Sequence, residues 1–262
     1  MIRGLWSAAS GMNAQQMNID VISNNLANVN TPGFKRVHLN FEDVMYSTEK
    51  APGSPLSTGD LTPKGLQVGY GSKPASTSRS FSQGDLQATG GKTDLAVQGS
   101  GFFQILYTQS PDGFAYTRDG SFTRNDQGIL VNNSGYQLAN SPTFDPQATE
   151  VTIASDGTVS QTVNGVNTAL GTVQLARFPN PEGLRALGEN LYVPTEGSGA
   201  STVGNPGQEG LGTIAQGYLE SSNVRVVEEM VKMIQAQRAY EINSKSIQSS
   251  DEMMGIANNL RR

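Results

Sequence analysis

Hydrophobic residues at heptad spacing mark the two ends of the chain and hardly occur at that spacing between them. Near the start they fall at Leu5, Met12, Ile19 and Leu26. After residue 223 they return at Val224, Val227, Val231, Ile234, Ile242, Met253, Ile256 and Leu260. Because an α-helix brings residues three, four and seven positions apart onto one face, this spacing predicts two long terminal helices.

The first predicted helix covers about residues 3–29, and the second continues from about 222 to about 260. Thr31-Pro32-Gly33 ends the first, because the residue before proline avoids the helical conformation. The second helix is too long to pack wholly on a small domain, so we expect it to pair with the first in a coiled-coil-like layer. Amide side chains crowd the first apolar seam, which is typical of a helix enclosed by other subunits. The predicted subunit-interface residues are Leu5, Met12, Ile19, Leu26, Asn24, Asn25, Asn28, Val227, Val231, Ile234, Arg238, Tyr240, Ile242, Met253 and Leu260.

Between the first helix and the middle of the chain, residues 31–70 read as an extended linker. It contains an insert at residues 46–63 that is rich in proline, glycine and serine. Prolines restrict the backbone, so the insert is expected to pack as a stiff extended arm rather than as a free loop. The residues assigned to this rigid insert are Tyr46, Pro52, Gly53, Pro55 and Pro63.

Residues 71–221 show the short hydrophobic runs and frequent turns of a β-rich domain. Asp112-Gly113, Asp119-Gly120 and Asp156-Gly157 are predicted hairpin turns, because both residue types tolerate a positive φ. The predicted fold is therefore α+β. Residues 1–30 and 222–262 would form a terminal helical domain, 31–70 a linker, and 71–221 an outer β-domain.

Composition removes several classes of function. Residues 41–221 hold 9 Lys/Arg against 17 Asp/Glu, and no basic stripe is present to neutralise nucleic-acid phosphates. The chain has no cysteine, which excludes disulfides, thiolate catalysis and sulfur-ligated zinc. The opening Met1 to Trp6 lacks a cleavable signal pattern, and no apolar run approaches the ~18–20 residues that span a bilayer.

The sequence offers no group of residues suited to catalysis. His38 is the single histidine and lies in the linker, so any imidazole relay or histidine-based metal site would depend on it alone. The acids Asp119, Asp126 and Asp156 occupy turn positions where aspartate is expected for backbone reasons. We therefore predict a protein that is not an enzyme and that has no catalytic residue, cofactor or metal.

The terminal segments also resemble a known family. Ile22 to Lys35, which contains Asn24-Asn25-Leu26 and Thr31-Pro32-Gly33, resembles the N-terminal motif of the bacterial flagellar rod and hook proteins. Glu229 to Lys245 resembles their C-terminal motif. Segments similar to the β-domain of the family are Ser82–Leu86, Asp94–Phe103, Tyr116–Phe122 and Gly188–Tyr192.

The resemblance implies a structural subunit of the flagellar basal body, exported by the flagellar type III apparatus without a cleaved signal and located in the rod that spans the periplasm. The opening Met1 to Trp6, the segment Ala14-Gln15-Gln16 and the insert favour a subunit of the distal rod. Such a subunit would polymerise helically into a rigid hollow shaft that carries motor torque and encloses the export channel. Implied partners are copies of itself, the proximal rod proteins, the hook protein, and the P-ring and L-ring bushings.

Two alternatives remain open at this point. The chain could be the hook protein or a minor, proximal rod protein of the same family. A different class is a secreted β-rich enzyme or adhesin with coiled-coil ends. Electron microscopy of the purified protein under polymerising conditions separates the three readings. Straight tubes are expected of a distal rod subunit, curved tubes of a hook or other rod member, and no tubes of an enzyme or adhesin.

Overall fold

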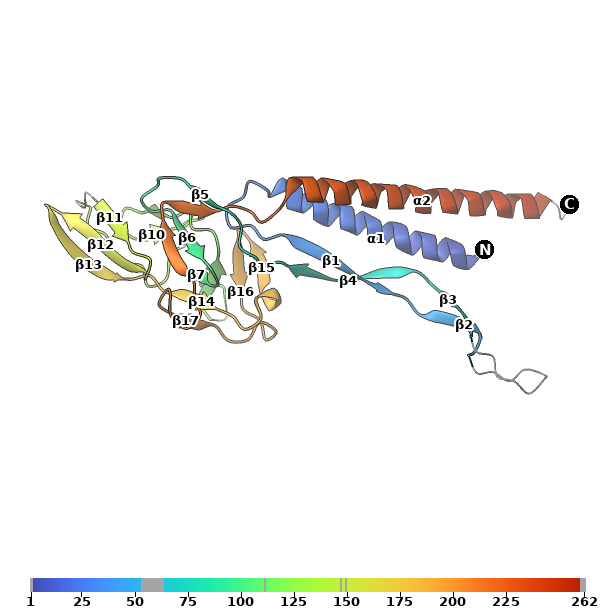
Figure 1. Ribbon diagram of the computed structural model, residues 1–262, viewed down its shortest axis with the longest axis horizontal. Coiled ribbons are helices and arrows are strands. Elements are labelled where there is room, and N and C mark those ends of the chain that lie inside the picture. Colours follow the sequence, from blue (N-terminus) through green and yellow to red (C-terminus); the bar gives the residue numbers. More distant parts are fainter. Residues whose placement is uncertain (1, 53–63, 111, 147, 149, 260–262) are drawn as a thin grey trace. The chain divides into compact units, whose positions relative to one another are not determined.

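The computed structural model describes residues 2–52, 64–110, 112–146, 148 and 150–259 of the chain. The chain divides into two compact units (Figure 1). The helical unit consists of residues 1–27, 37–78 and 225–262, and the β-unit consists of residues 28–36 and 79–224. The fold is α+β, with a β-rich middle and a helix at each end, as predicted. The extended linker, expected to be separate, belongs for the most part to the helical unit.

Two long helices lie side by side in the helical unit, α1 (Ile2–Ala27) and α2 (Val226–Asn259). Figure 1 shows them running antiparallel. Their register is constant over two heptads. Gly11 adjoins Asn243 and Asn25 adjoins Glu229, so the two contacts are 14 residues apart on each helix (11 to 25 and 229 to 243). Acidic Glu228 and Glu229 occupy the first turn of α2, where they complement the positive end of the helix dipole.

The linker forms a long two-stranded ribbon rather than a single extended arm. Strand β1 (Val37–Asp43) pairs with β4 (Ser72–Arg79), and β2 (Tyr46–Lys50) pairs antiparallel with β3 (Leu66–Gly69). Between the two ladders, Val44 donates its N–H to the Gly71 carbonyl at 2.9 Å and Tyr70 donates to Met45 at 3.2 Å. Strand β2 thus occupies the first part of the insert, and most prolines and glycines of the insert, at residues 53–63, lie outside the described residues.

A six-stranded antiparallel sheet organises the β-unit, in the order β15-β16-β8-β7-β14-β17. A three-stranded antiparallel sheet has the order β11-β12-β13, and the pairs β18-β6, β19-β5 and β10-β9 complete the unit. The bounds are β5 Leu86–Ala88, β6 Leu95–Gln98, β7 Phe102–Leu106, β8 Phe114–Thr117, β9 Thr123–Arg124, β10 Leu130–Val131, β11 Glu150–Ile153, β12 Thr158–Val163, β13 Val166–Thr172, β14 Leu175–Arg177, β15 Arg185–Gly188, β16 Leu191–Val193, β17 Thr202–Gly204, β18 Thr213–Gln216 and β19 Tyr218–Glu220, with a 3-10 turn at Pro181–Gly183.

Strand β7 shows why the β-unit has apolar contacts on both faces of its main sheet. Successive side chains of a strand point to opposite faces. Phe103 and Ile105 accordingly join the main core, and Phe102 joins an aromatic cluster on the other face. In that cluster the Tyr116 and Phe178 rings meet edge to face with centroids 4.7 Å apart. Phe102, Phe103, Tyr116 and Phe178 are thus all buried within the β-unit.

The three predicted Asp-Gly turns have two different explanations. Gly113 and Gly157 adopt φ values of 73° and 82° and close the hairpins β7–β8 and β11–β12, as predicted. Gly120 does not have a positive φ. Instead, a Cβ at Gly120 would overlap the carbonyl oxygen of Leu95, so that position requires glycine for close backbone approach.

Within the described part of the chain, no helix is long and apolar enough to cross a membrane.

Candidate assembly surface

Helix α2 exposes large apolar side chains on the face opposite to the one it buries. Its buried residues within the described range are Glu229 and Ala236, whereas Val227, Ile242 and Ile256 are 74%, 66% and 62% exposed. At 100° per residue, Glu229 and Ala236 lie about 200° and 180° around the helix from Val227. The exposed residues Val227, Met230, Val231, Ile234, Ile242, Met253 and Ile256 are named here the apolar stripe.

The buried face of α2 meets small residues of α1. Ala14 and Ala236 are 1% and 3% exposed, and the helices approach so closely at Gly11 that a Cβ there would lie 2.9 Å from Nδ2 of Asn243. Small side chains permit close approach but bury little apolar area. The contact between the two helices therefore leaves much of the apolar surface of α2 for other partners.

A buried amide connects the two helices to the ribbon. Asn25 donates from Nδ2 to the Val37 carbonyl at 2.8 Å and to Oε2 of Glu229 at 3.0 Å, and its Oδ1 accepts the Val37 N–H at 2.9 Å. Lys232 completes the group, with Nζ 2.9 Å from Oε1 of Glu229. Because Asn25 and Glu229 are each 1% exposed, their polar atoms depend on these partners rather than on water.

The predicted interface residues fall into three groups. On α1, Leu5, Met12, Ile19 and Leu26 are partly buried, Asn24 is exposed, and Asn25 is buried within its own chain; Asn28, in the β-unit, is partly buried. On α2, Val227, Val231, Ile234, Arg238, Tyr240, Ile242 and Met253 are all exposed. Leu260 lies outside the described residues. At 100° per residue all of the α2 group except Tyr240 lie within about 80° of Val227 and form one candidate surface, whereas Tyr240 lies on the face that meets α1.

The ribbon carries further exposed apolar side chains. Met45 is 80% exposed, Leu66 is 58% exposed, and Tyr46, one of the residues assigned to the insert, is 55% exposed. Pro52 is also exposed, whereas Gly53, Pro55 and Pro63 lie outside the described residues. A two-stranded ribbon cannot bury such side chains by itself, so this part of the helical unit is also available for contacts.

The β-unit contains a buried ionic cluster that the sequence analysis did not identify. Lys35 Nζ lies 2.5 Å from Oε1 of Glu220, and Arg118 lies 3.3 Å from Oε2 of the same carboxylate. The side chains of Lys35 and Glu220 are fully buried and that of Arg118 is 4% exposed. Glu220 also accepts the Gly84 N–H at 2.9 Å, and Lys35 donates to the Ser82 carbonyl at 2.8 Å.

Burial is the main influence on the pKa values of the two cations in this cluster. Burial lowers the pKa of both Lys35 and Arg118, and the Glu220 carboxylate partly offsets that effect. Two cations share one carboxylate, and Nε of Arg118 has no hydrogen-bond partner among the described residues. Lys35 and Arg118 lie in two of the segments that resemble the rod and hook family. That resemblance is the only feature of the sequence that points to them, and nothing in the sequence connects them with Glu220.

A second amide, that of Asn223, binds the backbone of the β-unit next to the point where the chain enters the helical unit. Oδ1 of Asn223 accepts the Arg36 N–H at 2.7 Å, and its Nδ2 donates to the Ser80 carbonyl at 2.9 Å. The chain passes from the β-unit to the helical unit between Arg36 and Val37. Two asparagines therefore bind consecutive backbone N–H groups. Asn223 accepts that of Arg36 within the β-unit, and Asn25 accepts that of Val37 within the helical unit.

The residues considered for catalysis have structural positions. His38 lies in β1. Asp119 accepts the N–H of Ser121 at 3.0 Å. Asp156 accepts that of Thr158 at 2.9 Å, and this hydrogen bond lowers the pKa of Asp156. Asp126 lies in the turn between β9 and β10. Among the residues the structure describes, no group of three or more His, Asp or Glu side chains is arranged to hold a metal ion.

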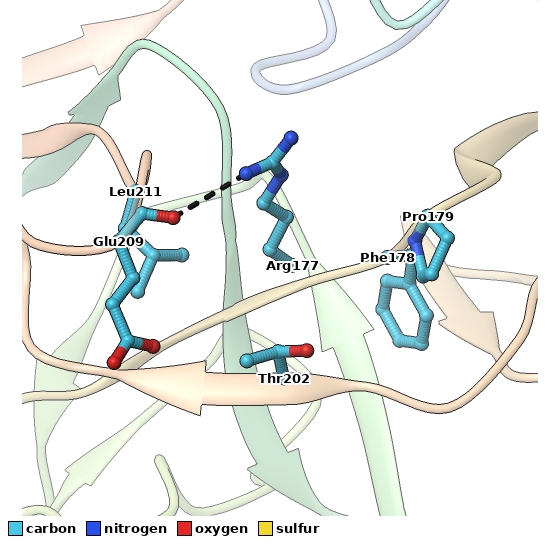
Figure 2. A pocket seen from close by; sticks show the side chains of 6 residues that line it. All are labelled: Arg177, Phe178, Pro179, Thr202, Glu209 and Leu211. Carbon is cyan, nitrogen blue, oxygen red and sulfur yellow. Dashed lines mark hydrogen bonds between the residues drawn. The ribbon is translucent and has the colours of Figure 1, made fainter.

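Figure 2 shows a pocket of about 270 Å³ in the β-unit, lined by Arg177, Phe178, Pro179, Thr202, Glu209 and Leu211. Arg177 donates to the backbone carbonyl of Glu209 at 3.3 Å, and the Glu209 carboxylate points away from the guanidinium. The pocket lies beside β14 and β17, and its lining holds one hydroxyl, that of Thr202, and one carboxylate, that of Glu209.

The apolar stripe and the exposed apolar side chains of the ribbon are the candidate surface of a structural subunit. The sequence matches agree. Residues 5–35 match the family model described as flagella basal body rod protein, residues 96–161 the flagellar hook protein FlgE/F/G D1 domain, and residues 215–260 the flagellar basal body rod FlgEFG protein C-terminal.

Relatives extend the match over the whole chain. The chain is 51% identical to the flagellar basal-body rod protein FlgG of Borreliella burgdorferi, over 100% of both chains. It is 49% identical to that of Buchnera aphidicola subsp. Acyrthosiphon pisum, over 97% of this chain and 98% of the relative. It is 38% identical to that of Bacillus subtilis, over 100% of both. The chain belongs to the FlgG family of flagellar basal-body rod proteins, which confirms the resemblance of its terminal motifs.

Proposed function

We propose that the chain is the repeating subunit of the flagellar distal rod and polymerises helically into a rigid hollow shaft. The observation that carries this proposal is the apolar stripe of α2. Seven large apolar side chains lie on one helix face, are at least 48% exposed, and point away from α1. Contact between water and such a surface is unfavourable. In a rod, neighbouring copies of the subunit would cover it.

The energetics favour contact between copies at this stripe. Fully burying one Val, Ile or Met side chain contributes roughly 1.5–3 kcal/mol, before the entropic cost of association. Val227 and Ile256 lie near opposite ends of α2, so neighbours can be engaged along most of the helix, which is about 51 Å long at 1.5 Å per residue. Contacts distributed in this way resist rotation of one subunit against the next, which a shaft that transmits torque requires.

In this arrangement the paired helices form the inner layers around an export channel, and the β-unit forms the outer layer. The subunit would leave the cell through the flagellar type III apparatus and function in the periplasm-spanning part of the basal body. Its partners would be copies of itself, the proximal rod proteins, the hook protein, and the P-ring and L-ring bushings. Membership of the rod family and the exposed helical surface support this assignment, and both favour a structural role over an enzymatic one.

The test uses Ile234→Asp, with Gln237→Asp as the matched control. Both positions are exposed on α2, and both substitutions add one negative charge. Burying an unpaired carboxylate between subunits costs several kcal/mol, so Ile234→Asp should abolish tubes in electron microscopy and motility in cells. Gln237→Asp should retain both. Motile cells carrying Ile234→Asp would disprove assembly through the stripe, and curved parent tubes would indicate a hook-like polymer instead.

A further inference from the structure

The two edges of the three-stranded sheet β11-β12-β13 differ in how their backbone is covered. At the β11 edge, Gln216 donates from Nε2 to the Val151 carbonyl at 2.9 Å, and its Oε1 accepts the Ile153 N–H at 3.0 Å. One side-chain amide thus makes the two hydrogen bonds that a neighbouring strand would make. This edge is closed to further strands.

The β13 edge is open. Among the described residues, β13 has no backbone partner other than β12, and its first four residues, Val166 to Ala169, are all exposed. No charged residue and no proline occurs from Gly157 to Ala176. Soluble proteins ordinarily protect exposed edges with lysine, proline or a covering segment, because an unprotected edge accepts another strand. The absence of these devices indicates that β13 is covered when the protein is assembled.

A second open edge occurs on the other sheet of the same unit. Strand β17 ends the six-stranded sheet, pairs with β14, and has no further backbone partner in the described part of the chain. It lies in an uncharged segment from Gly197 to Gln208, and Val203 is 39% exposed. The remaining free end of this sheet, β15, differs because it includes Arg185 and is bounded by Glu182 and Glu189.

Charge favours a second copy of this chain as the occupant of these edges. The β-unit holds thirteen Asp/Glu against eight Lys/Arg, so two copies repel over most of their surface. Approach is least costly where both surfaces are neutral, and β13 and β17 lie in long neutral segments. Two different edges on one unit make a heterologous, head-to-tail contact, which generates an open array rather than a closed dimer.

We propose that β13 of one copy adds to the free edge of β17 of a neighbouring copy, which continues the six-stranded sheet across the subunit boundary. This inference rests on the proposed polymer and adds to it a contact in the outer layer. Backbone hydrogen bonds between strands fix register and direction. The contact therefore fixes the position of each β-unit against the next, whereas the apolar stripe supplies contact area.

The absence of cysteine in the chain makes disulfide trapping a direct test. Asn167→Cys is combined, in separate variants, with a cysteine at each of Thr202, Val203 and Gly204, and tubes are oxidised and run on a denaturing gel. Facing residues of antiparallel strands have Cα atoms about 4.5–5.5 Å apart, within the range for a disulfide. At least one pair should give a ladder of covalent multimers that collapses to monomer on reduction.

Asn167→Cys with Leu187→Cys on β15 is the matched control, and a ladder from that pair alone would overturn the assignment to β17. Tubes that form normally and give no ladder with any β17 cysteine overturn the strand contact and leave the rod function intact. A parent protein that forms no tubes counts instead against the proposed function.

A charge substitution tests the contact without cross-linking. Ala169→Lys places a charge on the open edge, and Thr152→Lys places the same charge on the exposed face of β11, the strand whose edge Gln216 closes. Ala169→Lys should raise the protein concentration needed for tube growth severalfold, and Thr152→Lys should match the parent. Equal behaviour of the two variants would overturn the proposal.

Discussion

The carboxamide of Asn25 donates a hydrogen bond to the carboxylate of Glu229 at 3.0 Å, although 204 positions separate the two residues in the chain. The same amide pairs with both backbone groups of Val37. One side chain thereby joins the first helix, the last helix and the start of the ribbon. The bonds are buried, so each atom that loses a partner is left without water to replace it.

Asn25→Ala is therefore expected to destabilise the helical unit by about 1–3 kcal/mol, because the Val37 N–H and carbonyl and the Glu229 carboxylate lose partners. Hydrogen exchange provides the measurement, since the Val37 amide should lose protection. Ser23→Ala, at an exposed position two residues earlier, is the control and should leave that amide protected. Unchanged protection in Asn25→Ala would show that water replaces the amide.

The two glycines of α1 are expected to respond oppositely to alanine. Nothing lies within 4 Å of a Cβ at Gly4, so Gly4→Ala should stabilise α1 by up to about 1 kcal/mol through helix propensity. At Gly11 the new Cβ would meet Asn243 at 2.9 Å, so the same substitution should lose that gain or destabilise the pair. Asn243→Ala should restore the gain to Gly11→Ala. Thermal unfolding of assembled tubes measures the two single variants and the double variant, and identical effects at Gly4 and Gly11 would contradict close helix approach.

The buried Lys35 should make the stability of the β-unit depend on pH. Its pKa in the folded protein is lower than the ordinary value of 10.5, mainly because of burial, so the unfolded chain binds more protons in the interval between the two. Stability should consequently rise with pH through that interval. Burial raises the pKa of Tyr192 above its ordinary 10.0 and reverses the trend at higher pH.

Urea midpoints measured between about pH 7 and 9.5 test this dependence. Near-UV circular dichroism is a suitable probe, because Tyr116 and Tyr192 are buried in the β-unit. Lys35→Met removes the titrating group and should flatten the slope while the protein stays folded, since Arg118 remains paired with the Glu220 carboxylate. The same slope in parent and variant would show that Lys35 is not its source.

The ribbon is expected to limit the bending of tubes by lying across neighbouring subunits. Tyr46→Ser with Leu66→Ser removes two exposed apolar side chains from opposite strands of its outer part. Tubes should still form through the apolar stripe but should bend more easily, as measured by persistence length in electron micrographs. Thr48→Ala with Gln67→Ala, an exposed pair on the same two strands, is the control and should leave the tubes straight. Equal stiffness in both double variants would reduce the ribbon to a surface feature.

The helices were predictable from sequence because their apolar spacing is a local signal. The expected spans, 3–29 and about 222–260, compare with Ile2–Ala27 and Val226–Asn259. The same spacing identified the face of α2 that is exposed, but it could not identify the face that pairs with α1. That face contains Glu229, Ala236 and Asn243, and neither polar nor small residues produce a hydrophobic period.

Contacts between distant segments were the part that sequence reasoning could not supply. Glu220 is about a hundred residues from Arg118 and nearly two hundred from Lys35, and no spacing rule connects them. The ribbon was missed for a similar reason, because β2, which begins the insert, pairs with β3, which follows the insert. The prolines and glycines of the insert gave no indication of this pairing.

The apolar stripe faces away from α1, and this has a kinetic consequence for growth of the proposed polymer. Two free subunits that meet in solution can cover only part of each other's stripe, so a small aggregate retains much exposed apolar surface and dissociates. A subunit that arrives at the tip of an existing shaft meets several neighbours at once and covers the stripe in a single step. New shafts should therefore start rarely without a template, and elongation should be confined to the tip.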